Sequence, residues 1–62
     1  MIKEYRKLRG FTQEEFAEKI DISWRQLQRI EKNEQETSVR TLKKIVQVLK
    51  IPDKEVITYL KS

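Results

Sequence analysis

The 62-residue chain contains no cysteine and no histidine, and only one glycine and one proline. Without cysteine no disulfide can cross-link the fold, and without both residue types the usual zinc-binding spacings are absent. Only carboxylates, lysines and hydroxyls are left as catalytic groups, and no glycine-rich phosphate loop accompanies them. The sequence therefore predicts no catalytic residue, no metal site, no cofactor and no small-molecule ligand, so we do not expect an enzyme.

The chain also lacks long hydrophobic runs. No segment approaches the roughly 20 apolar residues that a membrane-spanning helix needs, and the first residues lack the apolar core of a signal peptide. We therefore expect a cytoplasmic protein with no membrane partner. Residues 1–62 are enough for a single domain with a small core, so we expect packing alone to provide a marginal stability.

Amphipathic segments fill most of the chain and predict an all-α fold. Hydrophobic residues recur at helical spacing and predict five helices and no strand, at about residues 2–9, 13–20, 24–32, 39–49 and 53–60. Gly10 is expected to end the first helix with a positive φ, and Pro52 precedes the last. The polar stretch 33–37 predicts a loop, with Asn33 ending the third helix in the left-handed conformation.

Residues 12–31 have the layout of a helix-turn-helix, in which the second of two short helices contacts DNA. Thr12 and Ser23 each precede an apolar periodic run, and Glu15 stands where a capping box with Thr12 requires it. Only Asp21 and Ile22 separate the first helix from the cap of the second. Because so short a turn cannot return the chain antiparallel, we expect the two helices to cross at a steep angle.

Several parts of the chain together resemble the Cro/repressor (Xre-type) helix-turn-helix family of phage and bacterial regulators. The matching residues are Arg6, Thr12, Gln13, Ala17, Ile22, Ser23, Arg29, Ile30 and Glu31, followed by the stretches 38–42 and 52–57. The resemblance implies a five-helix, lambda-repressor-like domain with the helix-turn-helix at helices 2 and 3. It also implies sequence-specific binding of double-stranded DNA by a transcription regulator, which we expect to be a repressor.

Four residues of the second motif helix are expected to contact base edges in the major groove: Trp24, Arg25, Gln28 and Arg29. The forked donors of arginine suit guanine O6 and N7, and the glutamine amide suits adenine N6 and N7. The sequence leaves open which arginine reaches a base and which binds phosphate. Trp24 departs from the family, which usually has a polar residue there. Its indole either packs on a thymine methyl or a sugar, or lies over the start of the preceding helix.

The resemblance also implies contacts to the DNA backbone and one internal ion pair. The residues expected to contact phosphates are Gln13, Ser23, Arg40 and Lys43, with Lys44 as an alternative to Lys43. A solvated Gln13 is the other interpretation of that residue. Arg6 and Glu31 resemble the family's ion pair between the first helix and the end of the reading helix. The net charge of +4, with basic residues gathered on the first helix and the reading helix, agrees with phosphate binding.

Two further expectations concern partners. One such module contacts too few base pairs to select a genomic site, and family members commonly pair on their operators, so we expect a weak homodimer. The alternative function is a protein-interaction module of the same fold, such as an antitoxin-like or adaptor protein. Apolar surface for such a partner would come from Tyr5, Leu8, Ile57, Tyr59 and Leu60.

Overall fold

The computed structural model describes residues 1–61, including their side chains except those of Glu36, Tyr59, Leu60 and Lys61. In chain order its elements are α1 (Ile2–Leu8), α2 (Gln13–Lys19), α3 (Trp24–Lys32), the 3₁₀ helix η1 (Glu34–Glu36), α4 (Val39–Leu49) and α5 (Asp53–Lys61). The predicted all-α class is confirmed, and each predicted α-helix agrees with the observed one to within one residue at either end. None of the helices in residues 1–61 combines the length and the hydrophobicity needed to span a bilayer.

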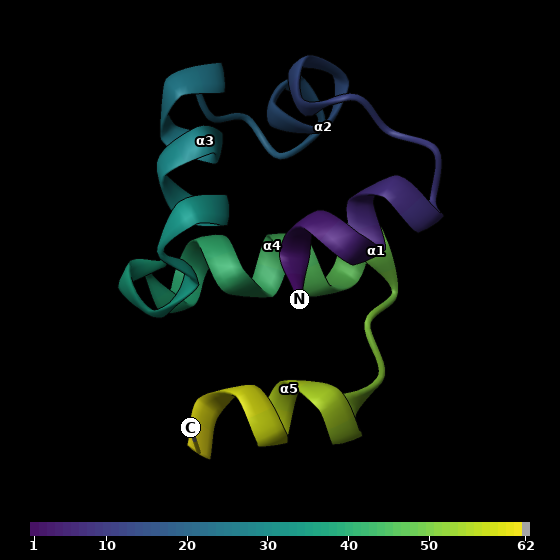
Figure 1. The fold of residues 1–62 in the computed structure, drawn as a ribbon, viewed down its shortest axis with the longest axis vertical. Coiled ribbons are helices and arrows are strands. Elements are labelled where there is room, and N and C mark those ends of the chain that lie inside the picture. Colours follow the sequence, from purple (N-terminus) through teal and green to yellow (C-terminus); the bar gives the residue numbers. More distant parts are fainter. Residues whose placement is uncertain (62) are drawn as a thin grey trace.

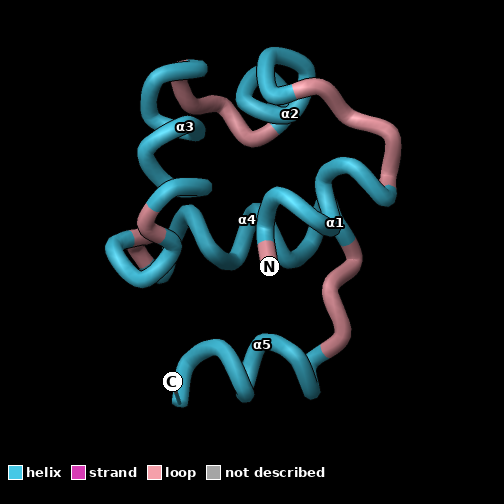
Figure 2. Tube along the Cα trace, in the orientation of Figure 1, coloured by secondary structure: helices cyan, strands magenta, loops and turns pink. Residues whose placement is uncertain are grey.

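The helices are arranged around a pair formed by α1 and α4. These two pack against each other through the middle of the molecule, and α2 and α3 meet above them (Figure 1). α5 lies on the far side of α4 from α2. Figure 2 shows that the connection between α3 and α4 includes a helical turn, η1, which packs against α3. The arrangement therefore leaves one side of α3 free of other helices.

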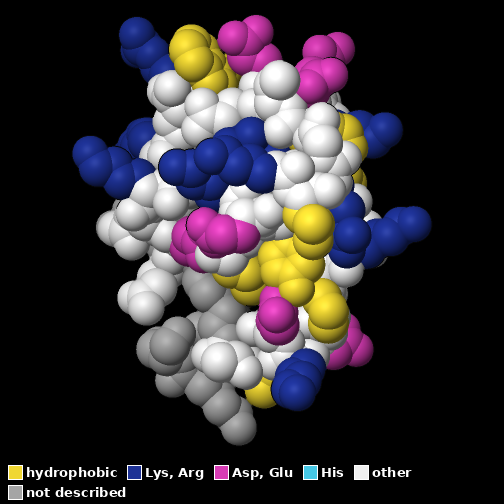
Figure 3. Space-filling view, turned by 45° about the vertical axis from the view of Figure 1, so that its right-hand side comes forward, with side chains coloured by type: hydrophobic (Ala, Val, Ile, Leu, Met, Phe, Trp, Pro, Cys, Tyr) yellow, Lys and Arg dark blue, Asp and Glu magenta, His cyan; other side chains and the backbone are white. Residues whose placement is uncertain are grey.

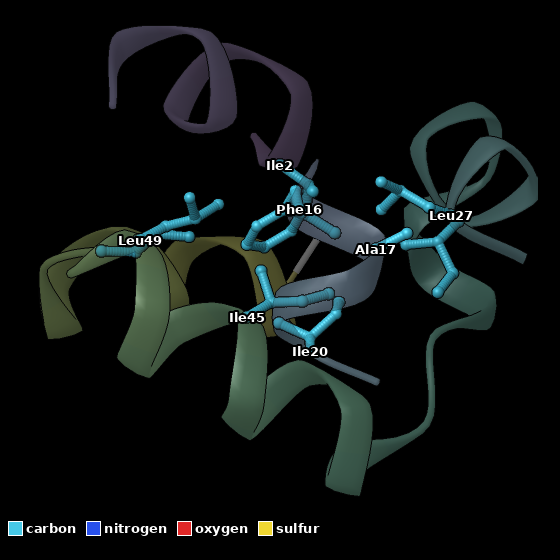
Figure 4. Packing of buried hydrophobic residues seen from close by; sticks show 9 residues of the cluster. Ile2, Phe16, Ala17, Ile20, Leu27, Ile45 and Leu49 are labelled. Atoms are coloured by element: carbon cyan, nitrogen blue, oxygen red, sulfur yellow. The ribbon is translucent and has the colours of Figure 1, made fainter. Parts of the chain in front are cut away.

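A single cluster of buried side chains holds this arrangement together. Its members are Ile2, Phe16, Ala17, Ile20, Leu27, Ile30, Ile45, Leu49 and Ile51. Figure 4 shows the Phe16 ring in the middle of the cluster, with Ile2 and Ile45 close to it. Ala17, which is 2% exposed, faces Leu27 across the α2–α3 contact, where its small side chain allows the close approach of the two helices. The periodic residues of both motif helices thus belong to the core, together with residues from the rest of the chain.

Within residues 1–61, three helices are followed within two positions by a residue with positive φ. These are Gly10 at 82°, Asp21 at 61° and Lys50 at 53°. After each, the next residue donates its backbone N–H to the carbonyl five positions earlier, which is the pattern of a Schellman motif. Gly10 was predicted in this role, and Asp21 belongs to a residue type that tolerates it. The left-handed Lys50 was not predicted, and it is followed by Ile51, which is buried.

The prediction that Asn33 ends α3 is confirmed, but the left-handed conformation predicted for it is wrong. Asn33 has φ −140° and ψ 78°, which is not the left-handed conformation. Its N–H is donated to the Arg29 carbonyl at 2.9 Å, and the chain enters η1 directly instead of turning away from the helix. The loop predicted at 33–37 therefore contains a 3₁₀ turn, a short element that needs no hydrophobic periodicity to form.

Candidate nucleic-acid interface

Local hydrogen bonds set the two helices of the motif. The Thr12 hydroxyl accepts from the Glu15 backbone N–H at 3.1 Å, and the Glu15 carboxylate accepts from the Thr12 N–H at 2.9 Å. These reciprocal bonds form the predicted capping box. Ser23 Oγ accepts from the Gln26 N–H at 3.1 Å, so α3 begins at Trp24. The Ser23 cap sets the start of α3, and burial of Leu27 and Ile30 sets which of its side chains face outward.

The outer face of α3 is a strip of exposed polar and basic side chains. Four residues at successive helical spacing line one shallow surface, namely Arg25, Gln28, Arg29 and Lys32. Three of them were predicted to contact bases. Lys32 was not, although its spacing from Gln28 and Arg29 places it on the same face and could have identified it. We call these four residues the α3 strip.

A groove lies between the α3 strip and the start of α4. Arg25 and Arg29 line it from α3, and Ser38 and Thr41 line it from α4, with Ser23 at the α3 end. Ser38 Oγ caps α4 by accepting from the Thr41 N–H at 3.2 Å. The structure thus brings Ser23, a predicted phosphate contact, to the same groove as two arginines.

The basic side chains Arg40, Lys43 and Lys44 of α4 are not among those that line this groove. Arg40 is exposed in the first turn of α4, between the groove-lining residues Ser38 and Thr41 in sequence, and Lys43 is exposed one turn further along. Lys44 lies instead with Lys19 and Asp21 in a separate hollow at the end of α2. Lys44 therefore lies at a different surface from the groove, whereas Arg40 and Lys43 are exposed residues of α4 that line neither of the two hollows.

A chain of hydrogen bonds joins the first residue of α3 to its last turn. Trp24 Nε1 donates to Gln13 Oε1 at 3.1 Å, and Gln13 Nε2 donates to Glu31 Oε1 at 3.0 Å. Arg6 Nε donates to Glu31 Oε2 at 2.7 Å, and Arg6 Nη1 donates to the Phe11 carbonyl at 2.8 Å. The Arg6 and Glu31 side chains are only 7% and 5% exposed, so their ion pair is buried. We call Trp24, Gln13, Glu31 and Arg6 the polar relay.

The polar relay fixes the orientation of the Gln13 amide. The indole N–H of Trp24 can only donate, and the Glu31 carboxylate can only accept, so the amide oxygen must face Trp24 and the amide nitrogen must face Glu31. The bond to Glu31 uses one of the two N–H groups that this nitrogen carries. Sequence reasoning assigned Gln13 to a phosphate and missed both internal partners, because they lie 11 and 18 positions away.

Trp24 lies on the α2 side of α3, away from the groove with α4. It lines a shallow depression together with Gln13 at the start of α2 and with Lys3 and Lys7 of α1. Of the two positions expected for this indole, the structure shows the one beside the start of α2. The side chain is nevertheless 48% exposed. Lys3 and Lys7 were not assigned to the site, although their i, i+4 spacing places them on one face of α1.

Apolar surface is present away from the α3 strip. Leu8 of α1 and Ile57 of α5 are 69% and 52% exposed, whereas Tyr5 is half-buried with the Arg9 guanidinium 5.8 Å from its ring centre. The side chains of Tyr59 and Leu60 lie outside the described residues. Figure 3 shows one face of the molecule on which Lys and Arg side chains form a band across the upper half, with acidic and hydrophobic side chains above the band and a hydrophobic patch below it.

The fold and the exposed α3 strip define a helix-turn-helix DNA-binding domain. Residues 2–56 match the protein-family model described as helix-turn-helix, and the chain belongs to this family, the Xre-type (Cro/repressor) helix-turn-helix regulators. It is therefore a DNA-binding transcription regulator whose partner is double-stranded DNA. Searches of curated proteins and of solved structures gave no significant match.

Proposed function

We propose that this protein represses transcription by occupying an operator, with α3 inserted in the major groove. The observation that carries the proposal is the α3 strip, which presents two arginines, a glutamine and a lysine on one face that no other helix covers. An α-helix fits the major groove of B-DNA, and its N-terminal residues meet the base edges first. A domain bound there blocks access of polymerase to the same DNA.

Base reading falls to Arg25, Gln28 and Arg29 in this proposal. Arg25 lies in the first turn of α3 and is the better placed of the two arginines to reach guanine O6 and N7. Gln28 follows one turn later and suits adenine. Each bidentate contact contributes roughly 1–3 kcal/mol of discrimination against a wrong base. Arg29 lies on both the strip and the groove toward α4, and we assign it either to a base or to a phosphate.

Phosphate contacts come from both sides of α3. On the α2 side, Gln13 holds an amide in a fixed orientation that can donate its second N–H to the DNA backbone. On the α4 side, Ser23 lines the groove, and its hydroxyl can donate a proton to phosphate while still accepting from Gln26. Arg40 and Lys43 extend this side along α4. Contacts on both sides would hold α3 in one register on the duplex.

We also propose that two copies bind together as a weak homodimer on an inverted repeat. A single α3 strip spans too few base pairs to select one genomic site. Symmetric pairing of two copies on half-sites about 34–36 Å apart would double the sequence that is read.

The test is a selection of binding sites from a random duplex library at near-physiological salt. Native protein is compared with Arg25→Ala plus Arg29→Ala, and Lys44→Ala serves as a matched control because Lys44 lies in the separate hollow beside α2. We expect an inverted repeat that the native chain and the control enrich and the double variant does not. A single enriched half-site would contradict the dimer alone. No enrichment by a folded native sample would contradict the proposed function.

The exposed Leu8 and Ile57 favour a second candidate, a protein-interaction module of the same fold. Salt dependence separates the two. Binding to DNA through several phosphates weakens steeply as salt rises, because counterions are released on binding, whereas burial of an apolar surface does not. Affinity for a selected duplex should therefore fall by orders of magnitude between low and moderate salt.

A further inference from the structure

The indole of Trp24 has no hydrogen-bonding capacity left for DNA. Its single polar group is Nε1–H, which is a donor only, and this donor is already bonded to Gln13 Oε1 at 3.1 Å. Gln13 is in turn held by Glu31, whose carboxylate is buried in the ion pair with Arg6. Turning the indole toward a base acceptor would leave the Gln13 oxygen without this bond. The polar relay therefore holds the N–H against Gln13.

The rest of the indole is nevertheless available to a partner. Trp24 is 48% exposed, it is the first residue of α3, and the adjacent Arg25 belongs to the α3 strip. With the N–H engaged, the exposed part of the ring consists of carbon and aromatic C–H. In the major groove, the group that matches such a surface is the C5-methyl, which thymine carries beside its O4 acceptor and which guanine, adenine and cytosine lack.

We propose that Trp24 makes the first position of α3 a detector of the thymine methyl group, with no hydrogen bond to the base. This inference rests on the proposed function, since it requires α3 to enter the major groove. It assigns the polar relay a role beyond stability, because the relay determines which surface of Trp24 meets DNA. The same bond makes Trp24, together with Glu31, one of two residues that position the Gln13 amide.

The test replaces each thymine of the selected operator, one at a time, by deoxyuridine, which removes only the C5-methyl. Affinity is measured by fluorescence anisotropy at constant salt. For the native chain we expect one position in each half-site at which the replacement weakens binding about three- to fivefold, as expected for one buried methyl group. At the other thymines we expect a smaller effect.

Two variants assign the effect to Trp24. In Trp24→Gln, deoxyuridine at that thymine position should no longer weaken binding, because the glutamine amide cannot replace the apolar surface of the indole. In Trp24→Phe the weakening should persist, since the aromatic face remains, while affinity for all sequences falls because Gln13 is no longer held by the indole N–H. Far-ultraviolet circular dichroism verifies that both variants are folded.

Three outcomes would contradict the inference about Trp24 and leave the proposed function intact. One is an enriched operator with no thymine opposite the start of α3. Another is a native chain that is insensitive to deoxyuridine at every position. A third is a methyl effect that persists in Trp24→Gln, which would assign the contact to another residue. Failure of the proposed function would be visible earlier, as the absence of any enriched operator.

Discussion

The inner and outer faces of α3 differ in burial and in polarity. On the inner face Leu27 and Ile30 are buried in the core, and Glu31 is locked into the ion pair with Arg6. On the outer face the α3 strip is exposed throughout. The comparison shows that the residues we propose to read DNA are not the residues that form the core. The proposed DNA-reading residues can therefore change without altering the core that presents them.

Trp24 shares properties with both faces of α3. It is exposed as a DNA-reading residue would be, yet its indole N–H joins it to the polar relay that ends at the buried ion pair. A substitution of Trp24 should therefore change both the affinity for DNA and the hydrogen bonds of the polar relay. The predictions below test the separation of the two faces.

The largest effect is expected from breaking the ion pair on the inner side. Glu31→Leu leaves the Arg6 guanidinium buried without its carboxylate, and we expect it to lower the free energy of unfolding by about 3–5 kcal/mol. This is enough to unfold much of so small a domain. Arg6→Met combined with Glu31→Leu should recover part of the loss. Urea unfolding followed by circular dichroism measures both, and a double variant less stable than the single one would contradict the prediction.

Removing core volume from the inner face should have a similar or slightly smaller effect. Leu27 is fully buried, so Leu27→Ala is expected to cost about 2–5 kcal/mol through lost burial and a residual cavity. Its neighbour Gln28 supplies the matched control on the outer face, where Gln28→Ala should change stability by less than about 0.5 kcal/mol. Thermal and urea unfolding compare the two. Equal losses would show that the outer face also contributes to the fold.

Removing the Ser23 cap of α3 should have an intermediate effect on stability. Ser23→Ala removes the acceptor for the Gln26 N–H, and we expect a loss of about 1 kcal/mol. Ser23→Gly should cost less, because glycine is tolerated at this position. Denaturant titration at pH 7 distinguishes the variants. A loss as small for alanine as for glycine would mean that the hydroxyl does not stabilise α3.

The smallest effect on stability is expected from Glu15. Its carboxylate is exposed, like the side chains of the α3 strip, but it accepts a hydrogen bond from the Thr12 N–H. The hydrogen bonds from the Thr12 backbone and hydroxyl hold the pKa of Glu15 below its ordinary value of 4.5. Because the folded pKa is the lower one, the charged form stabilises the fold above the ordinary value, and this contribution is lost as the pH falls through the folded pKa. The stability difference between native protein and Glu15→Gln should therefore shrink below about pH 4.5. A pH-independent difference would show that the charge plays no part.

Long-range polar contacts mark the limit of what could be predicted. Glu34 Oε2 accepts from the Ile2 backbone N–H at 2.7 Å, so the first turn of α1 is capped from η1. Arg9 Nε donates to the Leu49 carbonyl at 2.8 Å and so satisfies the end of α4. Both pairs are more than 30 positions apart, and no local pattern indicates either of them. The Trp24 to Gln13 bond is of the same kind.

Residues close together in the chain were enough to predict the helices, the capping box, the Ser23 cap and, apart from Lys32, the residues of the α3 strip. These features depend on hydrogen bonds and side-chain spacings within a few residues, so neighbouring residues encode them. The conformations of Asn33 and Lys50 and the hydrogen-bond partners of Trp24 and Gln13 became known only from the folded structure. Those outcomes depend on the distances and angles at which helices pack, and residues far apart in the chain set these together.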